Sequence, residues 1–219
     1  MRVFLLHTVR PGLDSFEAAI LELYPGHQVY NVLSDYWNKK VLVENEGFSK
    51  KSQLYLLETC VSMQDTGADM IVCTCNSLSP YLAKVRDLLE IPVVLIDEYV
   101  PSAILENGHR ILVVATADSS VNAAISSISL EAERQEISCE LTSICLDDAG
   151  QIMRSGGDMA EHDRIIIESL SGIQADLYDA VLLTQLSTAH LGKELGAVTG
   201  LPVVTTPEIC LRHLKPYLS

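Results

Sequence analysis

The sequence predicts an α/β protein built from two similar halves, each with a parallel sheet, and three observations support this prediction. Short β-rich runs alternate with helical patterns along the chain, as is typical of βαβ units in a parallel sheet. The β-rich runs are apolar on both faces, as expected of a sheet covered by helices. The second half of the chain then repeats the first.

The first half contains four expected strands, each ending in small polar residues. They span residues 2–6, 28–33, 70–73 and 93–96. Two amphipathic helical patterns lie between them, one over residues 16–23 and one over residues 54–63. The first of these patterns ends at Pro25-Gly26, a pair that is typical of a helix stop.

Three segments of the second half match the first at a nearly constant spacing. Residues 2–8 correspond to 110–116, residues 69–75 to 179–185, and residues 91–94 to 201–204, with offsets of 108, 110 and 110 residues. We therefore expect two similar domains, 1–100 and 101–206, related by pseudo-two-fold symmetry. The C-terminal helix, 207–219, is expected to pack on the first domain.

Polar residues collect where the expected strands end. Because ligands of parallel α/β sheets bind at the carboxyl ends of the strands, these residues are candidates for a binding site. They are His7, Thr8, Cys75, Asn76, Ser77, Thr116, Gln185, Leu186 and Ser187. If the two halves face each other, these groups share one cleft, and a small substrate is reached from both faces.

Composition excludes several classes of protein. The net charge of −14 argues against nucleic-acid binding, which requires basic patches. No apolar run approaches membrane-spanning length, and the N-terminus lacks the pattern of a secretory signal, so a cytoplasmic protein without membrane association is expected. The chain has no nucleotide phosphate loop and no common metal-binding spacing, so we expect no cofactor and no metal.

Cys75 is the strongest single candidate. The segment Thr74-Cys75-Asn76-Ser77 ends a strand, and Leu78-Ser79-Pro80 opens a helix. A thiol at a helix N-terminus is expected to have a lowered pKa, and backbone N–H groups there can bind a carboxylate. The structural alternative is a buried cysteine in a tight turn. The other five cysteines are interpreted as structural thiols.

A second polar cluster, His162-Asp163, follows Gly156-Gly157-Asp158. A loop that leads into a helix N-terminus explains this segment, with acidic residues favoured in the first turn. The functional alternative is a catalytic histidine–aspartate pair. His190 is interpreted as a surface or hydrogen-bonded histidine rather than as a base.

Taken together, the motifs resemble the aspartate/glutamate/hydantoin racemase superfamily over nearly the whole chain. The segments that carry the resemblance are His7-Thr8-Val9, Cys75-Asn76-Ser77, Ile96-Asp97-Glu98, Ala115-Thr116, Gly157-Asp158, His162-Asp163, Pro202-Val-Val and Thr206-Pro207-Glu208. The resemblance implies two Rossmann-like domains and a cofactor-independent isomerase or racemase. It implies a small anionic carboxylate or a hydantoin-like compound as the ligand, and it leaves a homo-oligomer open.

In that superfamily two cysteines face each other: one thiolate removes the α-proton, and the other thiol reprotonates the opposite face. The resemblance implies that Cys75 is the first of these cysteines. It further implies that Asn76, Ser77 and Thr116, with Ser119 or Ser120, hold the substrate carboxylate.

The chain departs from the superfamily pattern at two positions. Gln185 replaces the second cysteine, and an amide cannot exchange protons near neutral pH. His7 stands where the superfamily often has aspartate. Three hypotheses follow: an isomerase that uses Cys75 with His7 or water as the second proton source, a decarboxylase-like lyase with one thiol, and a carboxylate-binding protein without catalysis.

Overall fold

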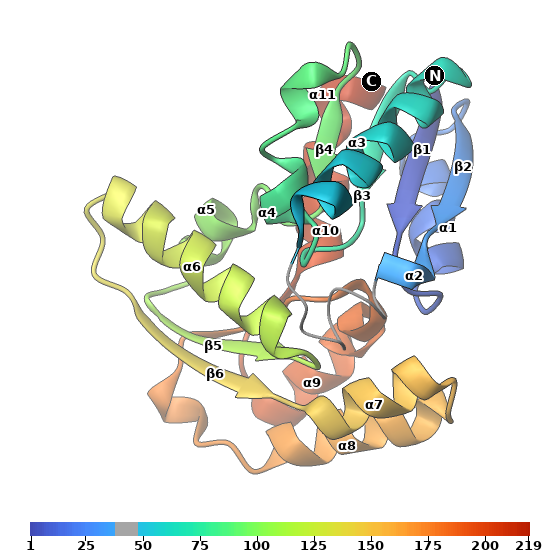
Figure 1. Cartoon of the computed structure of the whole chain (residues 1–219). Coiled ribbons are helices and arrows are strands. Elements are labelled where there is room, and N and C mark those ends of the chain that lie inside the picture. Colours follow the sequence, from blue (N-terminus) through green and yellow to red (C-terminus); the bar gives the residue numbers. More distant parts are fainter. Residues whose placement is uncertain (38–47) are drawn as a thin grey trace. The chain divides into compact units, whose positions relative to one another are not determined.

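The computed structural model of the chain describes residues 1–37 and 48–219, which form two compact units (Figure 1). Unit 1 comprises residues 1–98 and 210–219, and unit 2 comprises residues 99–209. Each unit contains one four-stranded sheet in which all neighbouring strands are parallel. The predicted fold class, two α/β units with parallel sheets, is confirmed.

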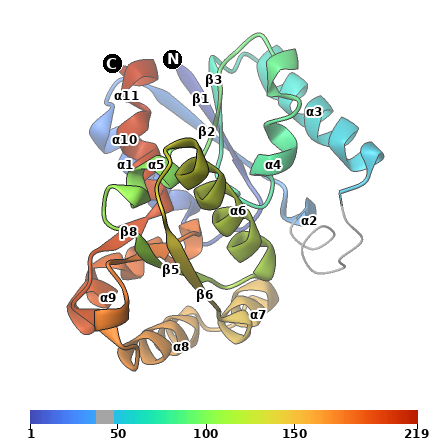
Figure 2. The same cartoon turned by 90° about the vertical axis from the view of Figure 1, so that its left-hand side faces the viewer.

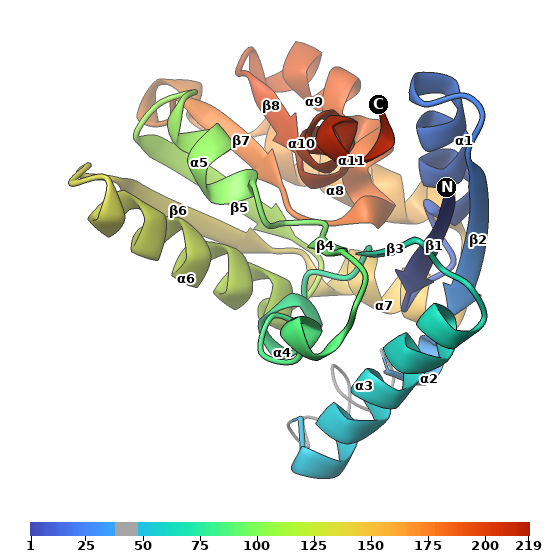
Figure 3. The same cartoon turned by 90° about the horizontal axis from the view of Figure 1, so that it is seen from above.

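Unit 1 alternates strands and helices as the sequence indicates. Its elements are β1 (Arg2–His7), α1 (Leu13–Leu23), β2 (Gln28–Leu33), α2 (Asp35–Trp37), α3 (Lys50–Asp65), β3 (Met70–Cys73), α4 (Ser79–Leu82), the 3-10 helix η2 (Arg86–Leu88), β4 (Val93–Leu95) and α11 (Lys215–Leu218). The strand order is β2-β1-β3-β4. Helices α1 and α3 lie on opposite sides of this sheet (Figures 2 and 3).

The core of unit 1 follows from the alternation of side chains along its strands. Leu6, Ile71 and Cys73 point to the side of the sheet on which α3 packs, where Leu56 and Cys60 meet them. Helix α3 begins at the N-cap Ser49, whose hydroxyl accepts a hydrogen bond from the backbone N–H of Ser52 at 3.1 Å. Both faces of the central strands are therefore covered, and only their ends carry polar groups.

Unit 2 repeats this arrangement. Its elements are α5 (Val100–Leu105), β5 (Arg110–Ala115), α6 (Asp118–Arg134), β6 (Glu140–Cys145), α7 (Asp147–Ser155), α8 (Met159–Ser171), the 3-10 helix η3 (Ala175–Leu177), β7 (Ala180–Leu183), the 3-10 helix η4 (Leu186–Leu191), α9 (Gly192–Thr199) and β8 (Val203–Thr205). Helix α10 (Thr206–His213) leads from unit 2 back into unit 1. The strand order is β6-β5-β7-β8, which is equivalent, strand by strand, to the order β2-β1-β3-β4 of unit 1.

The two faces of the second sheet have separate cores. Ile111 and Val113 pack with Ile128 of α6 on one face. Leu112 and Val114 pack with α8 and α9 on the other face. Figure 1 shows α6 beside β5 and β6, with α7 and α8 lying side by side on the opposite face.

Two details differ from the expectation. Strand β6 (Glu140–Cys145) was not among the expected strands, because its polar and apolar residues give only a weak strand pattern. The helix expected after Cys75 is only the four-residue α4. Within the described residues, no helix is long and apolar enough to cross a membrane.

Candidate active site

The candidate residues of unit 1 come together because β1 and β3 are neighbours in the sheet. Leu6 pairs with Cys73 in the parallel register, so the segments that follow the two strands leave the sheet side by side. The carbonyl oxygen of Leu6 accepts a hydrogen bond from the backbone N–H of Thr74 at 3.0 Å, and the hydroxyl oxygen of Thr74 lies 3.1 Å from the same atom. Thr74 thereby fixes the start of the turn that carries Cys75.

Cys75 lies partly buried in this turn, and its thiol is surrounded by hydrogen-bond donors. The side chain of Thr8 and the backbone N–H groups of Ser77 and Leu78 hydrogen-bond to it. Burial nevertheless raises the pKa of the Cys75 thiol, because it outweighs these donors. We expected the helix start to lower this pKa, but α4 has only four residues and a correspondingly small dipole.

Asn76 and Ser77, which follow the thiol, are both buried, as is Thr8. All three sit at the carboxyl ends of β1 and β3, where the sequence placed them. Polar side chains are seldom buried without a hydrogen-bonding role, so this edge of unit 1 is polar in the way that a ligand-binding edge requires.

Asp97 adds a carboxyl group to the same edge, directly after β4. Its Oδ1 accepts a hydrogen bond from the hydroxyl of Ser79 at 2.5 Å, and that hydroxyl also lies 3.5 Å from the carbonyl oxygen of Cys75. Burial raises the pKa of the Asp97 carboxyl to about 6. Its negative charge in turn raises the pKa of Cys75.

His7 is fully buried, and both of its ring nitrogens are engaged within unit 1. Nε2 lies 3.0 Å from Oδ1 of Asn31, and Nδ1 lies 2.7 Å from the hydroxyl of Thr74. The amide nitrogen of Asn31 donates to the carboxylate of Glu17. The amide oxygen of Asn31 therefore faces His7, and Nε2 must be its donor.

Because Nε2 of His7 donates, Nδ1 is the acceptor for the hydroxyl hydrogen of Thr74, and the ring is neutral. Burial lowers the pKa of His7, against smaller opposing effects of Asn31 and Glu17. His7 thus acts on the thiol segment through Thr74, and its ring nitrogens do not reach a ligand directly in this arrangement.

The corresponding edge of unit 2 is built around Thr116 and Gln185. The side-chain oxygen Oε1 of Gln185 accepts hydrogen bonds from the backbone N–H of Thr116 at 2.6 Å and from its hydroxyl at 3.1 Å. Among the described residues, Nε2 of Gln185 has no hydrogen-bond partner. The two N–H groups at Nε2 of Gln185 are therefore available as donors, whereas Oε1 is occupied by Thr116.

Thr116 is also held from α7. Nη1 of Arg154 donates to the carbonyl oxygen of Thr116 at 3.3 Å, and Nη2 pairs with Asp147 at 2.6 Å. Helix α7 passes so close that a Cβ atom at Gly150 would lie 2.1 Å from the same carbonyl oxygen. A cation thus stands at the carboxyl edge of unit 2, whereas the thiol edge of unit 1 carries Asp97.

The remaining candidates of unit 2 lie in the segments that follow its strands. Ser119 and Ser120 are in the first turn of α6, and Ser120 is buried. Leu186 and Ser187 are buried in η4, directly after Gln185.

Cys145 ends β6 opposite Ala115, at the same edge as Thr116. Burial, together with a hydrogen bond to Asp118, raises the pKa of the Cys145 thiol to about 11. The sequence predicts a structural thiol at this position, but Cys145 is only partly buried. It stands at the end of β6, the strand that the sequence pattern does not predict.

His162, Asp163 and His190 form a hydrogen-bonded cluster in unit 2. Nδ1 of His162 lies 2.7 Å from Oδ1 of Asp163, and Nε2 of His190 lies 2.8 Å from Oδ2 of the same carboxylate. His162 is fully buried and His190 is 52% exposed at its side chain. Asp158 is the N-cap of α8, the helix that carries His162 and Asp163, and its side chain accepts a hydrogen bond from the backbone N–H of Ala160 at 2.9 Å. This agrees with the helix start expected from the sequence.

Asp97 belongs to a segment that carries the family resemblance but is given no role there, and Arg154 is not among the sequence candidates. Asp97 follows a strand and could have been found by the rule that drew attention to the other strand ends. Arg154 is nine residues beyond the end of β6, and only the path of α7 brings it to Thr116. No sequence pattern indicates that contact.

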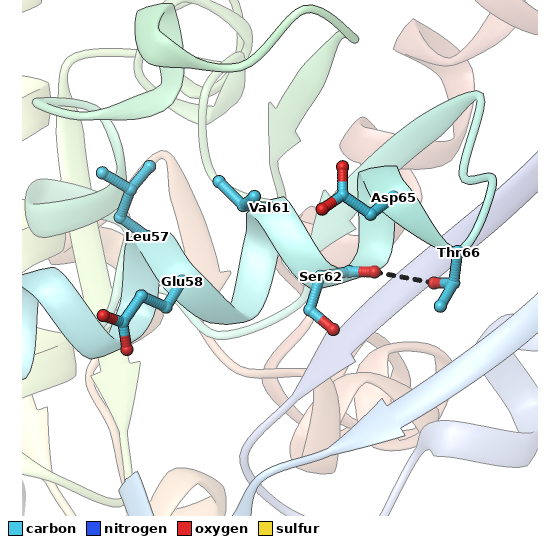
Figure 4. Close-up of a pocket in the computed structure, with 6 residues that line it drawn as sticks. All are labelled: Leu57, Glu58, Val61, Ser62, Asp65 and Thr66. Atoms are coloured by element: carbon cyan, nitrogen blue, oxygen red, sulfur yellow. Dashed lines mark hydrogen bonds between the residues drawn. The ribbon is translucent and has the colours of Figure 1, made fainter.

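Two surface hollows of unit 1 lie along α3, away from these strand ends. One, of about 400 Å³, is lined by α3 alone; Figure 4 shows Leu57 and Val61 on one side of the helix and Glu58 and Ser62 on the other. The second, of about 390 Å³, lies between α3 and the sheet. Neither contains a candidate site residue. No group of His, Cys, Asp or Glu side chains in the described part of the chain is arranged to hold a metal ion.

Comparison with known proteins gives one family and one fold. The profile of the Asp/Glu/Hydantoin racemase family matches residues 19–214. No curated protein sequence matches the chain significantly.

The solved structures that resemble the chain include a glutamate racemase from Thermus thermophilus in complex with β-chloro-D-alanine. Its TM-score is 0.74 at 15% identity, covering 99% of this chain and 80% of that one. An allantoin racemase from Klebsiella pneumoniae has a TM-score of 0.67 at 16% identity, covering 99% and 86%. An aspartate racemase homologue from Pyrococcus horikoshii has a TM-score of 0.65 at 15% identity, covering 99% and 98%. These likenesses show the fold.

Proposed function

The chain belongs to the Asp/Glu/Hydantoin racemase family and is a racemase- or isomerase-like enzyme, and from this premise we propose that it moves a proton at a carbon atom through Cys75. The substrate that we propose is a small carboxylate or a hydantoin-like compound. The observation that carries the proposal is the setting of Cys75: a thiol at a strand end, with the side chain of Thr8 and two backbone N–H groups around its sulfur.

The proposed chemistry is removal or delivery of a proton next to a carbonyl group. The donors around Cys75 stabilise its thiolate and therefore support its role as a base. The protonated thiol, whose pKa burial raises, serves as a proton donor to a carbanion. Acid–base chemistry of this kind needs no cofactor, and we propose none.

We propose that the polar groups at the carboxyl edge of each sheet are substrate-binding residues. Asn76 and Ser77 supply donors beside the thiol, and Thr116, with Ser119 or Ser120, supplies them in unit 2. Leu186 and Ser187, buried in η4 behind Gln185, complete this part of the proposed site. The first turn of α6, a helix of 17 residues, is suited to a carboxylate because its N–H groups point toward that end.

We propose that Gln185 orients the substrate and that His7 positions the turn that carries the thiol. Neither residue exchanges protons with the substrate in this proposal. Because Oε1 of Gln185 is occupied by Thr116, the N–H groups at Nε2 are the part that can donate to an oxygen atom of the substrate. His7, whose Nδ1 accepts from Thr74, holds the turn that begins at Thr74 and carries the thiol.

One observation also favours a second candidate, a decarboxylase-like lyase. Gln185 leaves β7 of unit 2 without a thiol at its end. Decarboxylation requires protonation on one face only, which Cys75 alone can perform. Release of carbon dioxide from aryl- and alkylmalonates distinguishes this reaction from racemisation.

The test uses both enantiomers of aspartate, glutamate and allantoin in D₂O, with loss of the α-proton followed by NMR. We expect exchange with at least one compound, and Cys75→Ala is expected to reduce it by about 10²–10⁴-fold. Cys139→Ala, which removes another partly buried thiol, is the matched control and should exchange at the wild-type rate. Equal exchange by Cys75→Ala and wild type would refute the proposal.

A further inference from the structure

Helix α3 of unit 1 carries its charged end residues in the order that a helix dipole disfavours. Lys50 and Lys51 are its first two residues, Asp65 is its last, and neither terminal turn contains a compensating charge. The positive end of a helix dipole lies at the N-terminus, so this order destabilises the helix. Helices α6 and α7 have the favoured order, with aspartate at the start and arginine in the last turn. The reversed order in α3 indicates that compensating charges come from outside the helix.

The charged residues of α3 have no ion-pair partner within the described chain. Lys50, Lys51, Glu58 and Asp65 are all exposed, and none of them pairs with another described residue. The chain has a net charge of −14, but these two lysines and two acids sum to zero. This surface is therefore neutral as a whole, with its positive charge in the first turn of α3 and its negative charge in the second half.

An apolar stripe runs along the side of α3 that faces away from the core of unit 1. Leu54 is 61% exposed, and Leu57 and Val61 are half-buried, whereas the fully buried residues of this helix face the core. With about 100° of rotation per residue, the residues at positions 50, 54, 61 and 65 fall within a sector of about 60°. We call this surface the outer face of α3; it comprises Lys50, Leu54, Leu57, Glu58, Val61 and Asp65 (Figure 4).

The outer face has both a protruding apolar side chain and a hollow that can receive one. The hollow, of about 400 Å³, lies over the second half of α3. It is bordered by residues spaced i, i+3, i+4 and i+7, the spacing that receives a side chain from a neighbouring helix: Glu58, Val61, Ser62 and Asp65. The exposed side chain of Leu54 protrudes from the first half of the same helix.

We propose that the outer face of α3 packs against the same face of a second copy of this chain, with the two helices antiparallel across a two-fold axis. In such a pair each step forward on one helix is a step back on the other. The alignment that sets Lys50 opposite Asp65 of the second copy therefore sets Leu54 opposite Val61, in the hollow. The axis then passes beside Leu57, which meets Leu57 of the second copy. Charge and shape give the same alignment.

The antiparallel pair compensates the unfavourable order of charges in each helix. Lys50 and Asp65 of one copy are about 22 Å apart along the helix, so only a second copy can join them. A parallel pair would set lysine against lysine and Asp65 against Asp65, which the charges disfavour. The apolar stripe supplies the affinity, and the exposed ion pairs supply the direction. Because the contact is isologous, it closes on itself and gives a dimer.

The outer face belongs wholly to unit 1 and lies away from the strand ends that carry the candidate active site. The dimer and the chemistry of Cys75 are therefore tested separately, and the failure of one leaves the other standing.

The first test is the association of the full chain, measured by sedimentation velocity over a concentration series. Salt at about 150 mM shortens the Debye length to about 8 Å and so screens the repulsion between two acidic chains. We expect a reversible dimer. Leu54→Glu places a charge in the hollow beside Glu58 and Asp65 of the second copy, so its Kd should be about 100-fold weaker or more. Leu130→Glu, at a similarly exposed leucine of α6, should dimerise as wild type does.

Two outcomes of this measurement overturn the proposal. One is a wild type that stays monomeric over the whole series. The other is a Leu54→Glu variant that dimerises with the wild-type Kd, because the dimer then uses another surface.

The second test is complementation between two charge reversals, Lys50→Glu and Asp65→Lys. Each variant alone sets like charges opposite each other at both ends of the helix pair, so each should dimerise about tenfold more weakly than wild type. In an equal mixture, both ends of the mixed pair again have opposite charges, and dimerisation should return to the wild-type level. Lys50→Glu also improves the order of charges along its own helix, so its weaker dimer cannot result from a weaker helix.

Both positions are exposed, and circular dichroism should show wild-type secondary structure for the two variants. Variants that each keep the wild-type Kd, or that associate no better when mixed than alone, overturn the antiparallel pair.

Discussion

At the amino ends of its central strands, each unit closes the same ion pair. Arg2 pairs with Asp69 at 3.2 Å in unit 1, and Arg110 pairs with Asp179 at 2.6 Å in unit 2. In both pairs the carboxylate also accepts the backbone N–H of the arginine, at 2.7 and 2.9 Å. This edge of the fold is the same in the two halves, down to the atoms that bond.

At the carboxyl ends of the central strands, the two units share their threonines but differ in the residue that these threonines contact. The hydroxyl of Thr74 lies 3.1 Å from the carbonyl oxygen of Leu6 in the neighbouring strand, and the hydroxyl of Thr184 lies 3.4 Å from that of Val114. Thr8 then contacts Cys75, whereas its counterpart Thr116 contacts Gln185. Thr8 and Thr116 therefore have the same structural role in the two units. The residue that each of them contacts, Cys75 or Gln185, determines which chemistry its unit can perform.

The histidines differ in the same sense. Unit 1 buries His7 at a position where unit 2 has Ala115, and the ring supports the turn of Cys75 through Thr74. Unit 2 draws its histidines from α8 and η4 instead, and both bond to Asp163. Unit 2 thus lacks a histidine at the end of β5 but has a histidine–aspartate cluster on α8 and η4.

The largest effect that we expect from altering this contrast is at Gln185. Gln185→Glu keeps an oxygen for the N–H of Thr116 but replaces the N–H₂ donor with a second oxygen atom. The kcat/KM of an anionic substrate should fall by roughly 10–100-fold, since one donor is lost and a like charge is added. Steady-state kinetics measures this, with Glu194→Gln, a surface change in α9, as the control. An unchanged kcat/KM would show that Nε2 does not contact the substrate.

A smaller effect is expected at Asp97. Its carboxyl has a pKa of about 6 and is mostly ionised at pH 7.5, where its charge disfavours the Cys75 thiolate. Asp97→Asn should therefore increase the rate of Cys75 alkylation by iodoacetamide by about fivefold, corresponding to roughly 1 kcal/mol of repulsion. Peptide mapping measures the rate. Asp87→Asn, an exposed carboxyl of the same unit, should leave it unchanged; a slower reaction in Asp97→Asn would contradict the assignment.

The smallest effect concerns His7 and the pH dependence of stability. Its pKa is lowered in the folded state, so unfolded His7 binds a proton that buried His7 does not as pH falls below about 6.5. The contribution is present above this pH and is lost on acidification. His7→Gln should therefore show a smaller drop in Tm between pH 7.5 and pH 5.5 than wild type.

The expected difference is a few degrees, since 1 kcal/mol shifts Tm by about 2–4 °C in a chain of this size. Thermal unfolding followed by circular dichroism measures it, and His109→Gln should show the wild-type drop. Equal drops for His7→Gln and wild type would mean that His7 is not neutral in the folded protein.

The sequence was sufficient for the frame of both units. The runs at 28–33 and 70–73 are strands with the predicted bounds, and the offset of about 110 residues reproduces the matching strand orders. Strand β6 escaped because its side chains give no clear apolar face: Glu140 and Ser143 are exposed and the residues between them are only partly buried. Strand β2 is no better buried, but Val29, Tyr30 and Val32 are strong strand formers and make it recognisable from composition.

The strand-end residues were also accessible from sequence, because a topological rule places them. The balance of forces on Cys75 was not, since burial competes with its hydrogen bonds and only coordinates reveal which is larger. The bond between Asp163 and His190 joins residues 27 positions apart on two helices, and neither has a neighbouring motif that predicts the other.

The contact between α7 and Thr116 has a consequence for comparing sequences. At position 150 any side chain would collide with the backbone oxygen of Thr116, and one helical turn later Arg154 donates to the same atom. A glycine followed four positions later by an arginine is therefore a sequence marker for chains that anchor this strand end from α7. Distant members of the family can be sorted by that marker, and those with a larger residue at the glycine position must separate α7 from the strand.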